Sequence, residues 1–283
     1  MEDKTIFPEL PDWWRIFLLA LSVASFLPQL GVFLVRRDSS GISPFYMLSN
    51  VLCATEQLAF LFLSAVIMPE DGYLIVHKPL TLGDWINLGH TAAIWVLWLI
   101  LFVLSLSFLP GHRVSRAAAA AICFVHLLVS VVPQFVDVLL LPHDPGQGVY
   151  YNLDLAQVLF WGHFLLVLPA TTVMRIVGVW LQAQKVISHP PGLPLPLSKA
   201  SLGLQAVVFA VVAVSWLGRL PSHVEDIFGD DLSRALIYWF AINDGLLAGG
   251  QALLLGLVGG RRTESTIAAT SEQTEPLLGR RSC

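Results

Sequence analysis

Seven long apolar runs fill most of this chain and constrain its fold more than any other feature. They cover residues 16–35, 45–68, 85–109, 117–141, 149–179, 201–220 and 232–258. A helix needs about 20 mainly apolar residues to cross a bilayer. Only 13% of the 283 residues are charged, whereas a soluble domain carries about 25%. We therefore predict an all-α integral membrane protein with seven transmembrane helices.

The basic residues fall unequally on the two sides of these runs. One side holds ten of them: Arg36, Arg37, Arg113, Arg116, Lys185, Lys199, Arg261, Arg262, Arg280 and Arg281. The other side holds five: Lys4, Arg15, Lys78, Arg219 and Arg234. Arg175, late in the fifth run, adds to the first group. Because cytoplasmic loops collect Lys and Arg, we expect an outside or lumenal N-terminus and a cytosolic C-terminus.

The first run carries a proline and a glutamine in its middle. Pro28 has no N–H, so the carbonyl of Ala24 loses its helical partner and the helix is expected to kink. Gln29 is a ready donor for that carbonyl, which must find a partner inside a bilayer. After a short basic loop, Ser43 and Pro44 are typical of a helix start. A kink without a functional role remains the alternative.

The surrounding sequence resembles a known signature. The stretch "SFLPQLGVFLVRRDSSGIS" at residues 25–43 is similar to the signature of the PQ-loop membrane proteins, which include the SWEET sugar transporters and the cystinosin-like lysosomal amino-acid transporters. "SGISPFYMLSNVLCATEQ" at residues 40–57 further resembles fungal members. The strong similarity covers residues 15–68 of the chain.

The resemblance implies two three-helix bundles joined by a linker helix. A lumenal N-terminus at 1–15 would precede a first bundle at 16–109, a linker helix at 117–141, a second, degenerate bundle at 149–258 and a disordered cytosolic tail at 259–283. The hinges would be Pro28, with Gln29 beside it, and Pro169, where Ala170 replaces the expected glutamine. A second Pro-Gln pair, Pro133-Gln134, lies in the linker helix, as a kink or a coincidence.

Ionisable residues inside membrane helices cost several kcal/mol and are functional candidates by default. Asp244 and Glu56 lie near mid-depth, and we expect Asp244 first and Glu56 second to couple transport to protons. The alternative is a structural hydrogen bond between helices. Four further candidates are Asp137 and Asp154, nearer the outer face, and His126 and His163, towards the middle of their runs.

Amides near these carboxylates are candidates for solute binding. Asn50 and Gln57 are seven residues apart and share a helix face. Asn243 directly precedes Asp244, and the resemblance to SWEET-type transporters, whose asparagines line a central pocket, favours it as a solute ligand. A hydrogen bond between helices is an equal alternative for Asn243.

The sequence contains no motif typical of several other classes of function. The eight histidines never stand four residues apart, and no nucleophile elbow or phosphate loop is present, so we expect no enzyme, metal or cofactor. No basic stripe suggests nucleic-acid binding. The tail "SEQTEPLL" resembles an acidic dileucine sorting signal, built from Glu272, Glu275, Leu277 and Leu278, that would bind sorting adaptors.

The sequence thus predicts a secondary transporter that works by alternating access in a lipid bilayer. Its solute is a small polar molecule, an amino acid by preference, exported with protons from a lysosome or vacuole. A sugar facilitator, a seven-helix receptor and a scaffold without transport are the alternatives.

Overall fold

The computed structural model describes residues 10–67, 76–77, 79–109, 113–140, 153–190, 195–219 and 230–274. Within these ranges it gives the backbone alone for 113–114, 137–140, 153–157, 230–237 and 261–274. The described secondary structure is entirely helical, with no strand in these ranges. The prediction of an all-α chain is confirmed to that extent.

The helices follow the predicted apolar runs. They are α1 Asp12–Arg36, α2 Pro44–Phe62 with its π-helical end η1 Leu63–Ile67, α3 Leu82–Ser107, α4 Arg113–Ser130, α5 Val132–Leu140, α6 Leu153–Gly162, η2 His163–Val167, α7 Leu168–Ile187, α8 Lys199–Trp216 and α9 Asp230–Thr274. Among the described residues, seven helical segments are long and apolar enough to cross a membrane. This matches the predicted number and indicates an integral, multi-pass membrane protein.

Local sequence signals explain where three of these helices begin. Ser43 caps α2 by accepting a hydrogen bond from the Tyr46 amide, with Pro44 in the first turn, as predicted. Thr81 and Asp84 form a reciprocal capping box at the start of α3. Ser198 caps α8 in the same way as Ser43 caps α2.

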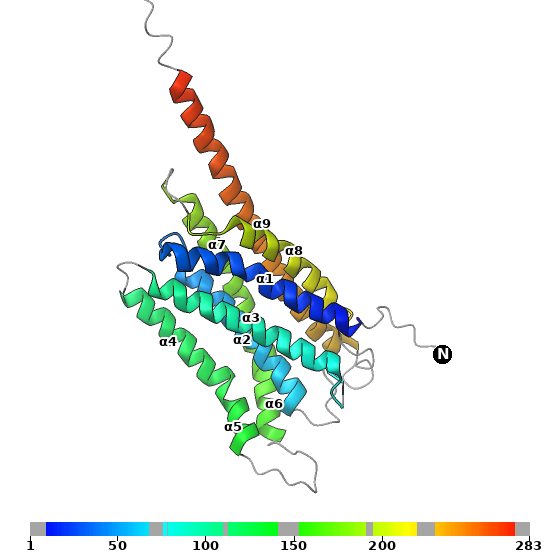
Figure 1. The fold of residues 1–283 in the computed structure, drawn as a ribbon. Coiled ribbons are helices and arrows are strands. Elements are labelled where there is room, and N and C mark those ends of the chain that lie inside the picture. Colours follow the sequence, from blue (N-terminus) through cyan, green and yellow to red (C-terminus); the bar gives the residue numbers. More distant parts are fainter. Residues whose placement is uncertain are drawn as a thin grey trace, which may run out of the picture.

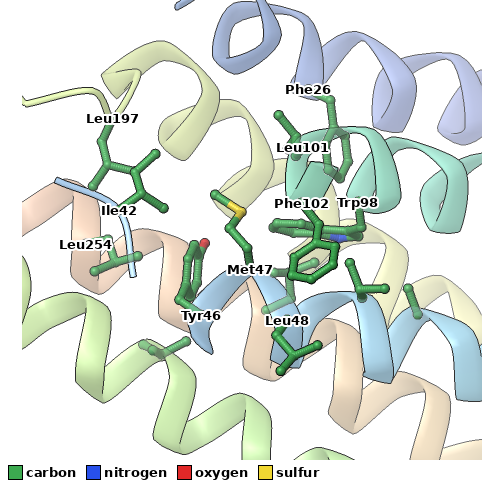
Figure 2. Packing of buried hydrophobic residues seen from close by; sticks show 14 of the residues in the cluster. Phe26, Ile42, Tyr46, Met47, Leu48, Trp98, Leu101, Phe102, Leu197 and Leu254 are labelled. Carbon is green, nitrogen blue, oxygen red and sulfur yellow. The ribbon is translucent and has the colours of Figure 1, made fainter. Parts of the chain in front are cut away.

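Helix α2 is the centre of the bundle. It packs against α3, α4 and α7. In its most apolar stretch, 83% of the residues are buried inside the protein. Helix α7 approaches it most closely at Gly178, where a Cβ atom would collide with the hydroxyl of Ser49. Phe26 of α1 and Tyr46 of α2 both meet Trp98 edge to face, with ring centroids 5.2 and 6.3 Å away (Figure 2).

We call α1, α2 and α3 the first triplet and α7, α8 and α9 the second triplet, from the contacts among them. In the first, α3 contacts both α1 and α2; in the second, α9 contacts both α7 and α8. Between the triplets, α1 packs on α8 and α2 packs on α7. The first helix of each triplet therefore packs on the second helix of the other.

Three segments differ from the sequence expectation. The linker helix at 117–141 is broken at Val131, and Pro133 takes the second position of α5, where its missing N–H costs nothing. The fifth span ends at Ile187 rather than 179, because polar side chains in its last turns are buried against other elements. The segment 259–274, expected to be disordered, continues α9 to Thr274 (Figure 1); it contains no proline, and its Ala, Glu and Gln residues favour helix.

Candidate functional site

The central helix α2 presents two consecutive polar residues to different neighbours. Glu56 is fully buried between His126 of α4 and His163 of η2. Its Oε2 lies 2.5 Å from His163 Nδ1. Its Oε1 lies 2.9 Å from His126 Nε2, within ion-pair distance but without hydrogen-bond geometry. We call these three residues the Glu56 cluster; each was a candidate from the sequence, and the fold brings them together.

His163 lies where the helix changes from α-helical to π-helical hydrogen bonding. It opens the π-helical turn η2, in which the amide of Leu168 bonds to the carbonyl of His163, five residues earlier. Pro169 follows directly and cannot donate a backbone hydrogen bond. The wide π-helical turn therefore accommodates the lack of the backbone hydrogen bond that the predicted hinge residue Pro169 cannot donate. Single π-turns of this kind are frequent at functional sites.

A polar stripe leads away from the Glu56 cluster along α4 and α5. Ser130 and Gln134 follow His126 at intervals of four residues, so the three lie close to one face. Ser130 lies near the Glu56 carboxylate. Both residues are buried, and neither Ser130 Oγ nor Gln134 Nε2 has a partner with good hydrogen-bond geometry within the described parts of the chain. Buried polar atoms without partners are costly, so each calls for an explanation. The stripe extends the polar surface of the Glu56 cluster towards one end of the membrane helices.

The second polar centre surrounds Asp244 of α9. The Trp216 indole donates to Asp244 Oδ2 at 2.7 Å, and Gln57 Nε2 lies 3.4 Å from Oδ1. The neighbouring Asn243 accepts a hydrogen bond from the Thr172 hydroxyl at 3.1 Å. Asp244 is only 6% exposed. Of the predicted solute and proton residues, Asp244, Asn243 and Gln57 therefore meet in one place, which we call the Asp244 cluster.

Arg175 of α7 completes the Asp244 cluster. It is 1% exposed and donates to the carbonyl of Asn243 at 2.7 Å, and its charge acts on Asp244. Its assignment to the cytosolic basic residues is wrong, because α7 continues for three more turns beyond it. The sequence signal that could have found it was an arginine inside an apolar run, which is a functional candidate by default.

Asn50 stands apart from these two clusters. Its amide nitrogen bonds to the Tyr46 carbonyl of its own helix, and its Oδ1 is buried without a partner among the described residues. On the same tyrosine, the hydroxyl accepts from Gln251 of α9 at 2.7 Å. Although Asn50 and Gln57 share a helix face, only Gln57 reaches Asp244.

Gln29 has a different partner from the expected one. Its amide donates to the Pro196 carbonyl at 2.9 Å and its Oε1 accepts from the Ser198 amide at 2.8 Å. The prediction that Gln29 serves the Ala24 carbonyl is therefore wrong, because the proline-rich connector before α8 lies against this face of α1.

Gln182 of α7 makes the corresponding bonds in the other triplet. Its Oε1 accepts from the Ser43 amide at 2.7 Å and its amide donates to the Gly41 carbonyl at 3.0 Å. Each glutamine thus holds the residue that caps the second helix of the opposite triplet. Gln182, rather than Ala170, is the structural counterpart of Gln29, and no proline precedes it. We call the two contacts the Gln29 clamp and the Gln182 clamp.

The structure describes no side-chain contact for the remaining site residues that were predicted from the sequence. The side chains of Asp137 and Asp154 lie outside the described parts of the chain, as does that of Glu272, whose backbone belongs to α9. Glu275, Leu277 and Leu278 lie outside the described residues altogether. Within the described ranges no group of His, Cys, Asp or Glu could hold a metal ion.

An apolar groove of about 350 Å³ opens between α3 and α4. Leu99, Phe102, Cys123 and Phe124 are among its lining residues. Such a lining suits lipid chains rather than a polar solute.

Comparison with known proteins identifies no relative: no family model matches the chain, and neither a curated protein nor a solved structure gives a significant match.

Proposed function

We propose that the chain is a secondary transporter of the PQ-loop type that moves a small zwitterionic solute, an amino acid, by alternating access. The observation that carries the proposal is that two buried groups of opposite charge, Asp244 on α9 and Arg175 on α7, act on each other inside the helical bundle. Opposite charges held apart on α9 and α7 can receive the ammonium and the carboxylate of one amino acid. Gln57 and Asn243 add neutral hydrogen-bonding groups beside them.

The Glu56 cluster supports coupling to protons. A carboxylate between two imidazoles can pass a proton to either neighbour without leaving an isolated charge. Asp244 is instead hydrogen-bonded by an indole and an amide, and the permanent charge of the Arg175 guanidinium acts on it; none of these groups exchanges protons near neutral pH. We therefore propose Glu56 as the proton carrier and Asp244 as the solute ligand, an order that differs from the sequence expectation.

The two clamps support a rocking motion of two three-helix bundles. Both join the triplets at one end of the helices, where Arg36 also donates to Leu195 and Lys185 to Ile42. Basic residues are concentrated at this end, which we propose faces the cytosol. Opening a path there requires these reciprocal bonds to break, with Pro28 and the π-turn before Pro169 as the places where α1 and α7 bend.

The proposed location is a vacuolar or lysosomal membrane, where an acidic lumen would drive export with protons. The support is the tail segment 271–278, similar to a dileucine sorting signal.

The test is transport by purified protein in liposomes. A panel of radiolabelled amino acids and sugars would be offered at two internal pH values, with Asp244→Asn beside the parent. We expect amino-acid flux that rises in the direction of proton flow and is lost in Asp244→Asn. Lys199→Gln, at the start of α8 and outside both clusters, is the matched charge-removing control and should transport like the parent.

Sugar flux that does not change with pH would identify a facilitator instead. Absence of flux for every solute would leave the receptor or scaffold function.

A further inference from the structure

A second set of buried arginines lies at the end of the bundle where α3 begins and α8 ends. Arg15 is 3% exposed and Arg219 is 1% exposed. Neither takes part in the Glu56 or Asp244 clusters by a hydrogen bond. Burying a guanidinium is costly unless it is paired with an anion or fully hydrogen-bonded.

Among the described residues, an imidazole and an indole ring contact the Arg219 guanidinium. One terminal nitrogen donates to His90 Nδ1 at 2.9 Å, and the guanidinium lies 4.9 Å from the centre of the Trp216 ring. Its Nε and other terminal nitrogen are buried without a hydrogen-bond partner within the described parts of the chain. Because His90 Nδ1 accepts this bond, Nε2 carries the proton and donates to Ser22 at 3.0 Å. His90 is therefore neutral and oriented, and it offers no counter-charge.

Arg15 extends the same positive surface. Its Nε donates to the Leu10 carbonyl at 3.1 Å, while one terminal nitrogen is buried and unpartnered among the described residues. A Cβ atom at Gly83 would collide with this guanidinium, so α3 approaches it closely there. Gly83 and His90 are seven residues apart and lie on one face of α3. Both arginines thus lie against this face, and the charge of Arg15 acts on Arg219.

None of the described carboxylates near the two arginines hydrogen-bonds to either guanidinium. Asp12 is 4.0 Å from Arg15 and its side chain is 45% exposed. Asp84 uses its oxygens on Thr81 and His77. Asp244 accepts a hydrogen bond from Trp216, and its charge acts on both Arg219 and Arg175. Burial lowers the pKa of Arg219 to about 10, so the guanidinium stays protonated at neutral pH.

We propose that Arg15 and Arg219 form a binding site for an oxyanion, a carboxylate or phosphate group, that hydrogen-bonds to the unpartnered guanidinium nitrogens. Guanidinium groups bind both kinds of anion through paired, charge-assisted hydrogen bonds. A soluble carboxylate or phosphate and the headgroup of an acidic lipid share this chemistry. The site lies beside Trp216, whose indole also donates to Asp244, and its occupation does not depend on transport.

The test is ligand binding by the full chain without any flux. The protein in neutral detergent would be titrated with inorganic phosphate or succinate against sodium chloride of equal ionic strength, with the thermal unfolding midpoint as readout. A parallel series would use nanodiscs of phosphatidylcholine with and without phosphatidylglycerol. We expect a saturable rise of the midpoint with at least one of these probes. Stabilisation by phosphate or succinate identifies a soluble anion, and stabilisation by phosphatidylglycerol alone identifies a headgroup.

Variants assign the effect to the two arginines. Arg219→Gln and Arg15→Gln should weaken the interaction at least about tenfold, whereas Lys199→Gln should leave it unchanged. Arg219→Lys retains the charge and serves where the glutamine variant fails to fold; it should bind more weakly than the parent. A parent protein that responds to none of the probes, or an Arg219→Gln variant that responds like the parent, would overturn the proposal whatever the transport assay shows.

Discussion

Glu56 and Gln57 are neighbours in α2, yet they lead to two polar centres of different character. Glu56 reaches two imidazoles, on α4 and on the π-turn before α7. Gln57 reaches Asp244, which is otherwise held by Trp216 and by the charge of Arg175. The first centre consists of groups that can gain and lose protons, and the second of a fixed pair of opposite charges.

Burial alone therefore does not assign a role to an intramembrane carboxylate. Glu56 and Asp244 are both buried and both near mid-depth, so they look alike in the sequence. Their partners separate them, because titratable imidazoles surround Glu56 and permanent donors surround Asp244. Four predictions test this distinction, in decreasing order of effect.

Arg175→Met should have the largest effect, because it leaves Asp244 buried without its cation and Asn243 without a donor to its carbonyl. Removing one partner of a buried charge pair costs about 3–5 kcal/mol of unfolding free energy. The measurement is reversible denaturant unfolding in mixed micelles. The double variant Arg175→Met/Asp244→Asn should recover much of the loss; simple additivity of the two single effects would show that the charges do not interact.

Glu56→Gln should separate proton coupling from solute binding. Glutamine keeps the shape and can still hydrogen-bond to His163, so the solute should still exchange across liposomes. The increase of flux with a proton gradient, however, should disappear. Exchange under equal pH on both sides and uptake under a gradient measure the two properties separately. A variant whose uptake still follows the gradient would return the coupling role to Asp244.

His163→Gln should slow gradient-driven uptake more than His126→Gln. His163 lies 2.5 Å from Glu56, whereas His126 lies 2.9 Å away without hydrogen-bond geometry. Losing a hydrogen bond to a charged group costs about 1.5–3 kcal/mol, or roughly tenfold to a hundredfold in rate. Initial rates at one gradient compare the two variants directly. Equal rates would mean that the two imidazoles share the proton equally.

Thr172→Val should have the smallest effect. It removes one hydroxyl that donates to Asn243, while Asn243 keeps its bond to the Trp239 carbonyl. The expected cost is about 1 kcal/mol in solute affinity, or a few-fold. Solute affinity by scintillation proximity would measure it, with Thr91→Val on α3 as a control, since Thr91 bonds only within its own helix. A loss as large as that of Asp244→Asn would make Asn243 a principal ligand.

Individual residues show how much of the site could be predicted from the sequence. Glu56, Asp244 and Asn243 could be singled out because each interrupts an apolar run, where a polar side chain is costly. Arg175 interrupts one too, but the end of its helix was placed eight residues too early, so it was assigned to a cytosolic surface. Gln182 could not be found, because it lacks the proline that marks Gln29 and is recognised only by its bonds to Gly41 and Ser43.

Local patterns in the sequence were enough to predict that the chain is helical, that seven segments are long and apolar enough to cross a membrane, and where α2 begins. These properties depend on hydrophobicity and on capping groups, which lie within a few residues of one another. The three-dimensional packing was needed to reveal that Glu56 meets two histidines, that Arg175 faces Asp244, and that Arg15 and Arg219 lie on one face of α3. Those pairings join helices far apart in the chain, and they depend on how the helices pack, which the apolar pattern of each helix leaves open.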